Sequence, residues 1–108
     1  MEIIATSIFL HNAKKIAKRY KSFNDDYHRL LEELEKSPNM GIDLGSGLRK
    51  VRLAISSKGK GKSGGCRFIT FNAIERNGVL YLLYAYDKSE ISAVSIKVMK
   101  EYIKLLGI

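Results

Sequence analysis

The sequence predicts a small α+β domain in which a strand and two helices precede three strands and a final helix. Apolar residues recur at helical spacing over residues 8–20 and 24–37. They alternate with polar residues along residues 48–55 and form a continuous apolar run over residues 79–86. The 108 residues are a typical length for one domain, so we expect residues 1–108 to fold as a single unit.

The N-terminal part predicts a strand followed by an antiparallel pair of helices. Residues 3–5 are Ile, Ile and Ala, which predict a short strand. The first helix places apolar residues such as Phe9 and Ile16 on one face, with lysines outside. Asn24 is a suitable N-cap for the second helix, which we expect to stop before Pro38. The short connection between the two helices makes them antiparallel.

The central part predicts a loop followed by a β-meander. Residues 40–47 contain three glycines, which indicate a loop. Residues 66–75 predict a strand, and the dipeptide Asn77-Gly78 after them is typical of a two-residue hairpin turn. The following run over residues 79–86 is apolar on both faces, so we expect an inner strand that is covered on each side.

The last helix is predicted between a capping serine and a terminating glycine. Ser95 can cap its N-terminus, and Gly107 can end it. Between them, Ile96, Met99, Ile103 and Leu106 share one face. The chain shows no internal repeat and no linker.

The net charge of +8 and the pI near 9.7 favour a polyanionic partner such as nucleic acid or ribosome. The excess lies in the middle, because residues 44–74 hold seven lysines and arginines and no carboxylate. The single cysteine, Cys66, excludes an internal disulfide and suits a reducing compartment, and we expect it in the core. No membrane span or signal-peptide pattern is evident, so the sequence predicts a cytoplasmic protein without a membrane partner.

The segment of residues 56–65, SSKGKGKSGG, carries lysines at alternate positions between glycines. The glycines formally match a dinucleotide-binding fingerprint, but a strand rather than a helix is predicted after them. A P-loop would require glycine where Ser56 stands. What remains is a flexible hairpin whose lysines can approach one phosphodiester backbone, or else a solvated surface loop with no target.

Cleavage of RNA needs few protein groups, because the ribose 2′-hydroxyl is itself the nucleophile. The protein must align the reacting atoms, move two protons and stabilise the extra negative charge. Arg67 suits the last role, since a guanidinium stays ionised and binds two phosphate oxygens. A lysine serves as base only where neighbouring cations lower its pKa from about 10.4. His11 and His28 lack the spacing of metal ligands, so we expect no metal site.

Three segments together resemble the HigB branch of the RelE-like bacterial toxins. They are residues 48–54 (LRKVRLA), 58–67 (KGKGKSGGCR) and 84–90 (YAYDKSE). The likeness extends over nearly the whole chain. It implies a RelE-like microdomain, in which an N-terminal strand and a two-helix hairpin pack on a small, mainly antiparallel sheet with a C-terminal helix.

The resemblance also implies a function. Such toxins of type II toxin–antitoxin systems enter the ribosomal A site and cleave mRNA during translation, which inhibits protein synthesis. They use no metal and no other cofactor. The partners implied are a cognate antitoxin, the ribosome and mRNA.

Residue roles follow from the same resemblance. Acid–base chemistry and charge stabilisation would belong to a catalytic set, Lys60, Lys62, Arg67 and Lys88. Contacts to RNA or ribosome would belong to a binding set, Arg49, Lys50, Arg52, Lys58 and Tyr86. Thr70 and Phe71 stand where relatives often have a tyrosine, which leaves the general base and the general acid unassigned.

Two alternatives come from other functional classes. The first is a non-catalytic toxin of the same fold that binds a protein such as DNA gyrase, although gyrase-directed relatives generally lack the lysine–arginine cluster. The second is a plain RNA-binding module, which would bind RNA in a salt-dependent manner without cutting it.

Overall fold

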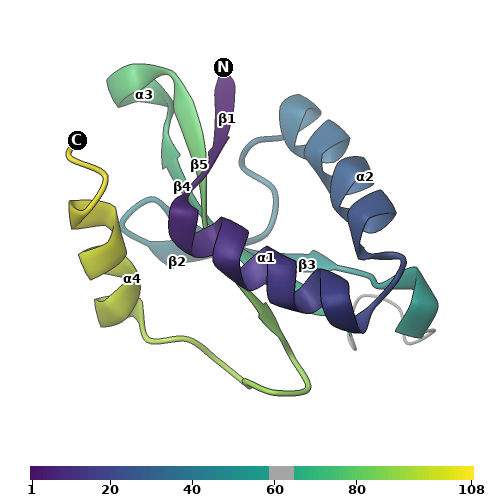
Figure 1. Cartoon of the computed structure of the whole chain (residues 1–108). Coiled ribbons are helices and arrows are strands. Elements are labelled where there is room, and N and C mark those ends of the chain that lie inside the picture. The colour runs from purple at the N-terminus through teal and green to yellow at the C-terminus, as the bar shows by residue number, and fades with distance from the viewer. Residues whose placement is uncertain (59–64) are drawn as a thin grey trace.

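The structure is a computed structural model that describes residues 1–58 and 65–108 (Figure 1). Its elements in chain order are β1 (Glu2–Ala5), α1 (Ser7–Arg19), α2 (Phe23–Lys36), β2 (Ile42–Gly45), β3 (Leu48–Leu53), the 3₁₀ turn η1 (Ser56–Lys58), β4 (Cys66–Ala73), α3 (Ile74–Asn77), β5 (Val79–Asp87) and α4 (Ile96–Lys104). The predicted α+β class and the order of its main helices and strands are confirmed.

The strands form one five-stranded sheet in the order β1-β5-β4-β3-β2. β1 runs parallel to β5, and the other three pairs are antiparallel, as the mainly antiparallel prediction requires. The β4–β5 pairing shifts by one residue between Ile69 and Thr70, where β5 carries an extra residue.

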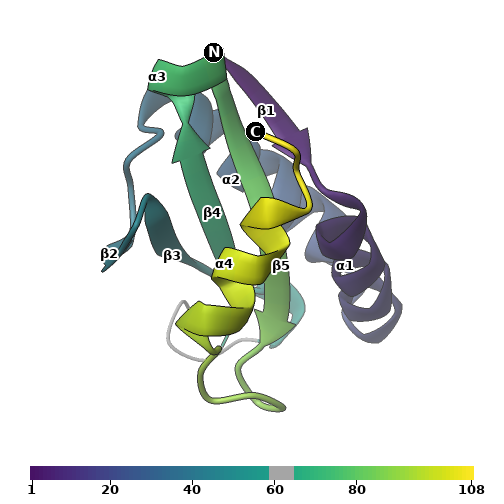
Figure 2. The same cartoon turned by 90° about the vertical axis from the view of Figure 1, so that its left-hand side faces the viewer.

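Two hydrophobic cores lie on opposite faces of the sheet. α1 and α2 cover one face, where Phe9, Leu30 and Leu34 pack against Phe68 of β4. α4 covers the other face and lies in front of β4 and β5 in Figure 2, with Met99 buried in that second core. β5 contributes buried residues to both cores, which confirms the prediction of an inner strand covered on each side.

Of the two predicted N-caps, Ser95 is confirmed and Asn24 is not. Thr6 caps α1 by accepting a hydrogen bond from the Phe9 amide, and Ser95 caps α4 by accepting one from the Val98 amide. The prediction that Asn24 caps α2 is wrong, because the helix begins at Phe23 and Ser22 occupies the cap position. The Ser22 hydroxyl does not cap the helix but binds side chains across the fold, as described below.

The predicted loop over residues 40–47 is also wrong, since β2 lies within it and pairs with β3. Ser46 and Gly47 form the two-residue turn between these strands, and both have positive φ, 56° and 82°. Such backbone angles are those of the tight turns that match the twist of a hairpin. The glycines therefore mark the turn of a hairpin and not a longer irregular loop.

Asn77-Gly78 does not form the predicted two-residue hairpin turn. Asn77 is the last residue of a single helical turn, α3, so β4 ends at Ala73 rather than at residue 75. Gly78 has φ +77° and ends α3 in the left-handed conformation that glycine adopts without strain. The Asn77 side chain accepts a hydrogen bond from the Val79 amide, which connects the turn to β5. The dipeptide still reverses the chain, but as the end of a helix.

Among the described residues, none of the helices has the length and apolar character needed to cross a lipid bilayer.

Candidate functional site

Two arginines and a tyrosine form a row across three adjacent strands at one end of the sheet. Arg52 of β3 pairs with Arg67 of β4, and Arg67 pairs with Tyr86 of β5. Residues directly opposite one another in a sheet project to the same side, and Tyr86 belongs to the core under α4. We call Arg52, Arg67 and Tyr86 the cationic row. The sequence separates its members, and strand pairing alone brings them together.

Arg67 and Tyr86 are buried at 3% exposure each, whereas Arg52 is exposed. Burial, and then the neighbouring charge of Arg52, lower the pKa of Arg67. Burial raises the pKa of Tyr86, although the charge of Arg67 acts in the opposite direction. The Tyr86 phenol therefore keeps its proton at neutral pH and can donate a hydrogen bond. Two adjacent guanidinium groups repel each other, and an anion placed between them relieves that repulsion.

The other predicted site residues lie near the cationic row, on the opposite face of the sheet, or outside the described residues. Lys50 lies two residues before Arg52 on β3, so it shares the face of the cationic row. Lys88 is exposed just beyond β5, and its amide donates to the Gly65 carbonyl at 3.3 Å. Arg49 projects to the opposite face and lies 3.6 Å from Asp43. Lys60, Lys62 and the side chain of Lys58 lie outside the described residues.

Gly65 explains one of the glycines in the lysine-rich segment. A Cβ at this position would lie 2.0 Å from the Leu53 carbonyl oxygen, which no side chain tolerates. The close approach lets β3 and β4 meet next to Arg52 and Arg67, at the end where the cationic row lies.

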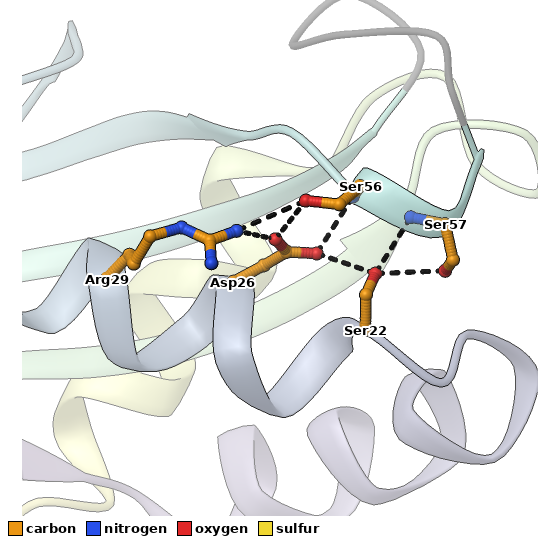
Figure 3. Close-up of polar contacts among 5 residues, drawn as sticks. All are labelled: Ser22, Asp26, Arg29, Ser56 and Ser57. Atoms are coloured by element: carbon orange, nitrogen blue, oxygen red, sulfur yellow. Dashed lines mark hydrogen bonds and ion pairs between the residues drawn. The ribbon is translucent and has the colours of Figure 1, made fainter.

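A buried carboxylate anchors the segment that leads from β3 toward the lysine-rich residues (Figure 3). Asp26 of α2 is 1% exposed and accepts hydrogen bonds from the Ser56 amide at 2.9 Å and the Ser56 hydroxyl at 2.6 Å. The Ser22 hydroxyl bonds to Asp26 at 2.9 Å and also accepts from the Ser57 amide. Arg29 forms an ion pair with the same carboxylate. These contacts fix η1 against the start of α2.

The Asp26 carboxyl should make stability depend on pH in the acid range. Burial alone would raise its pKa, but hydrogen bonds from Ser56 and Ser22 and the charge of Arg29 together lower it below the usual 3.8. A lowered folded-state pKa gives a contribution that is fully present above the unfolded-state pKa and is lost as pH falls through the folded-state pKa. We expect the stability difference between wild type and Asp26→Asn to be constant from pH 7 to about 5 and to shrink below about 4. Urea unfolding across this range tests it, and a difference that stayed constant to pH 2.5 would contradict it.

A second buried carboxylate holds the end of β5. Asp87 is 2% exposed and accepts a hydrogen bond from the Tyr20 hydroxyl at 2.5 Å. It also accepts bonds from the amide and the hydroxyl of Ser89, which orders the turn that carries Lys88. Arg19 lies 3.7 Å from Asp87 and also pairs with Glu90. The connection between α1 and α2 thus contacts both segments that flank the cationic row.

Removing the Tyr20 hydroxyl should destabilise the protein without changing its core. Tyr20→Phe takes a donor away from a buried carboxylate, and we expect a loss of about 1–2 kcal/mol in the free energy of unfolding. Tyr84→Phe is the control, because the Tyr84 hydroxyl makes no hydrogen bond among the described residues. Equal effects of the two substitutions in urea unfolding would show that the Tyr20–Asp87 bond contributes nothing.

Sequence reasoning missed both anchors, although one left a signal. Asp26 is spaced four and eight residues before Leu30 and Leu34, so it falls on the buried stripe of α2. An acidic residue on an apolar stripe indicates a buried, paired carboxylate. Asp87 ends an apolar run, which carries no comparable signal.

Among the described residues, no group of three or more His, Cys, Asp or Glu side chains could hold a metal ion. A small pocket of about 90 Å³ lies next to Arg52 and is also lined by Asp26 and Arg29. A groove of about 760 Å³ lies at the opposite end of the sheet, lined by residues of the β2–β3 turn, Arg49 and the α3 region.

The comparisons with known proteins support the fold. No protein-family model matches this chain. The crystal structure of the isolated E. coli RelE toxin is similar, with a TM-score of 0.59 and 16% sequence identity over 97% of both chains. The chain therefore has a RelE-like fold.

Proposed function

We propose that this protein is the toxin of a bacterial type II toxin–antitoxin system of the HigB branch and acts as a ribosome-dependent mRNA endoribonuclease. The observation that carries the proposal is the cationic row, at the end of the sheet where the lysine-rich segment leaves β3 and returns to β4. Similarity in fold to the E. coli RelE toxin supports the same interpretation. Fold alone does not decide function, whereas the chemistry of these residues bears on it directly.

The reaction suited to this site uses the RNA as its own nucleophile. A ribose 2′-oxygen loses its proton and attacks the adjacent phosphorus, while the bond from phosphorus to the 5′-oxygen breaks. The leaving oxygen takes up a proton. The products are a 2′,3′-cyclic phosphate and a 5′-hydroxyl end, and no other reactant is required.

Arg67 is assigned to the phosphate in the transition state. Arg67 and the adjacent Arg52 place positive charge next to an incoming phosphate. Because Arg67 is buried, water is partly excluded there, and the charge acts more strongly than it would in water. Tyr86 keeps its phenol proton and can donate a hydrogen bond to the same phosphate. Its 3% exposure does not offer a surface on which a base could stack.

The proton transfers are assigned to lysines. Lys60, Lys62 and Lys88 supply the candidate base and acid, and Lys50, Arg52 and Lys58 bind the RNA backbone. Arg49, on the other face, is a candidate contact to the ribosome. We expect a metal-independent reaction in the cytoplasm, without a small-molecule cofactor. A cognate antitoxin would quench it with an acidic or amphipathic segment that covers the cationic row or packs on the sheet.

Primer extension on a defined mRNA in a cell-free translation mixture tests the proposal, with and without ribosomes. We expect breaks within codons only when ribosomes translate the message, and no breaks with the Lys60→Gln/Arg67→Gln double variant. Breaks in ribosome-free RNA would replace the proposal with a free ribonuclease.

The alternative functional classes give different results in the same experiment. Intact mRNA together with stoichiometric inhibition of DNA supercoiling would identify a gyrase-directed toxin. Intact mRNA with salt-dependent RNA binding would identify a binding module.

A further inference from the structure

The outer face of α1 carries a concentration of positive charge that the proposed reaction does not use. Lys14, Lys15 and Lys18 are all exposed, and α1 contains no acidic residue. At 100° per residue they lie on the side of the helix opposite its buried residues Phe9 and Ile16. We call Lys14, Lys15 and Lys18 the α1 lysine face. It belongs to the helix in front of the sheet in Figure 1, on the side away from α4.

The fold does not require these lysines. None of the ion pairs formed among the described residues includes them, whereas Arg19 pairs with Asp87 and Glu90. Basic residues in the last turn complement the helix dipole, which accounts for Lys18 but not for Lys14 or Lys15. Lys14 and Lys18 are four residues apart, and like charges at this spacing destabilise a helix. The lysines of α1 therefore repel one another without stabilising the fold, which indicates that they bind a negatively charged partner.

The neighbouring helix has the opposite charge. Exposed acidic residues follow one another along α2, namely Asp25, Glu32, Glu33 and Glu35. Solvated surfaces usually intersperse the two signs, but here the charged residues of α1 are all basic, while those of α2 are mainly acidic, with Arg29 and Lys36 as the basic exceptions. Such a separation orients the molecule in the field of a polyanion, with α1 toward it and α2 away.

The α1 lysine face leads toward the cationic row. Tyr20, directly after α1, donates a hydrogen bond from its hydroxyl group to Asp87, and Lys88 is the residue after Asp87. The C-terminal end of α1 therefore lies at the same end of the molecule as the cationic row, although the two positive surfaces lie on opposite sides of the sheet. A nucleic acid larger than a single strand can contact both.

We propose that the α1 lysine face is a second RNA-binding surface, which holds the phosphate backbone of structured RNA outside the reacting site. The proposal rests on the proposed function, since it takes RNA as the partner. Lysines one helical turn apart are about 6 Å apart along the axis, comparable with neighbouring phosphates of a strand. A membrane surface fits less well, because an interfacial helix needs a broad exposed apolar face and Leu10 alone is exposed among the large apolar residues of α1.

The direct test is the binding of an RNA hairpin made of 2′-O-methyl nucleotides, which the proposed reaction cannot cut. Fluorescence anisotropy compares wild type with Lys14→Gln/Lys15→Gln/Lys18→Gln over a range of salt concentrations. We expect at least about tenfold weaker binding and a salt dependence reduced by about two phosphate contacts. The matched control is Lys97→Gln/Lys100→Gln/Lys104→Gln, which removes the same charge from the exposed residues of α4. It should weaken binding less than about threefold.

Two further readouts separate binding from folding and from catalysis. The α1 variant should melt no lower than wild type, because the substitution removes repulsion between lysines. In translating extracts it should need a higher toxin concentration for half-maximal mRNA cleavage, with an unchanged rate at saturation.

Three results would overturn the inference. They are equal losses in the two triple variants, an unchanged affinity of the α1 variant, or no hairpin binding by wild type. If wild type binds the hairpin through the α1 lysine face but never cuts mRNA, the RNA-binding surface is supported and the proposed nuclease activity is wrong. The failures of the two proposals are therefore distinguishable.

Discussion

Arg67→Gln is expected to lower the rate of mRNA cleavage by roughly 10²–10³-fold or more, the loss typical for removing one group that stabilises transition-state charge. The substitution removes the buried cation at the centre of the cationic row and leaves Arg52 and Tyr86 in place. Arg67→Lys should retain part of the rate, since it keeps the charge but cannot bind two phosphate oxygens at once. Single-turnover cleavage on programmed ribosomes measures both variants.

The control for Arg67 must separate chemistry from folding, because the residue is 3% exposed. Arg76→Gln removes the same charge from an exposed position on α3 and should cleave like wild type. Circular dichroism and thermal unfolding establish that each variant is folded. A folded Arg67→Gln protein with the wild-type rate would remove Arg67 from the site.

Asp26→Asn is expected to destabilise the protein by about 2–3 kcal/mol, because the donors that surround Asp26 would face an amide group in place of one carboxylate oxygen. In a chain of this size the loss corresponds to a melting temperature lower by roughly 10–20 °C. The Ser56 amide and hydroxyl bond to different carboxylate oxygens, so the asparagine keeps an acceptor for only one of them and holds η1 against α2 less tightly. We also expect weaker cleavage at temperatures where the variant is still folded, since η1 leads into the lysine-rich segment.

Asp25→Asn is the matched control for Asp26. It removes the same charge from the preceding residue of the same helical turn, where the side chain is exposed. We expect a change within about 0.5 kcal/mol. Equal melting temperatures of the two variants would show that the Asp26 network does not stabilise the fold.

The sequence was sufficient for those parts of the fold that depend on local pattern. Apolar spacing identified the three long helices, and the run from Val79 identified a strand buried on both faces. Ser95 was recognisable as a cap because its hydroxyl acts on a residue three positions away. In each case the information lies within one turn or one strand.

Glycine-containing segments were harder to predict because glycine permits several backbone conformations. Ser46 and Gly47 form a two-residue hairpin turn, and Gly78 ends a helical turn rather than a hairpin. Choosing between these conformations requires the pairing of the flanking strands, which no local pattern contains.

The candidate site was predictable only in part for the same reason. The basic residue types pointed to a polyanion, and the alternation along residues 48–55 places Arg49 and Arg52 on opposite faces, but only strand register shows that Arg52 lies opposite Arg67. The contact between Asp26 and Ser56 joins residues 30 positions apart. Such long-range contacts depend on the packing of α2 against the sheet and have no counterpart in sequence spacing.

The central claim is that the protein cuts mRNA by using the ribose 2′-hydroxyl as nucleophile. The most direct measurement places a single 2′-deoxynucleotide on the 5′ side of a mapped cut in an mRNA bound to programmed ribosomes. We expect the all-ribose message to be cut there to a 2′,3′-cyclic phosphate and a 5′-hydroxyl end. The substituted message should remain intact at that position. Cutting at the deoxynucleotide would contradict the account, because that message has no nucleophile at the position where the proposed chemistry requires one.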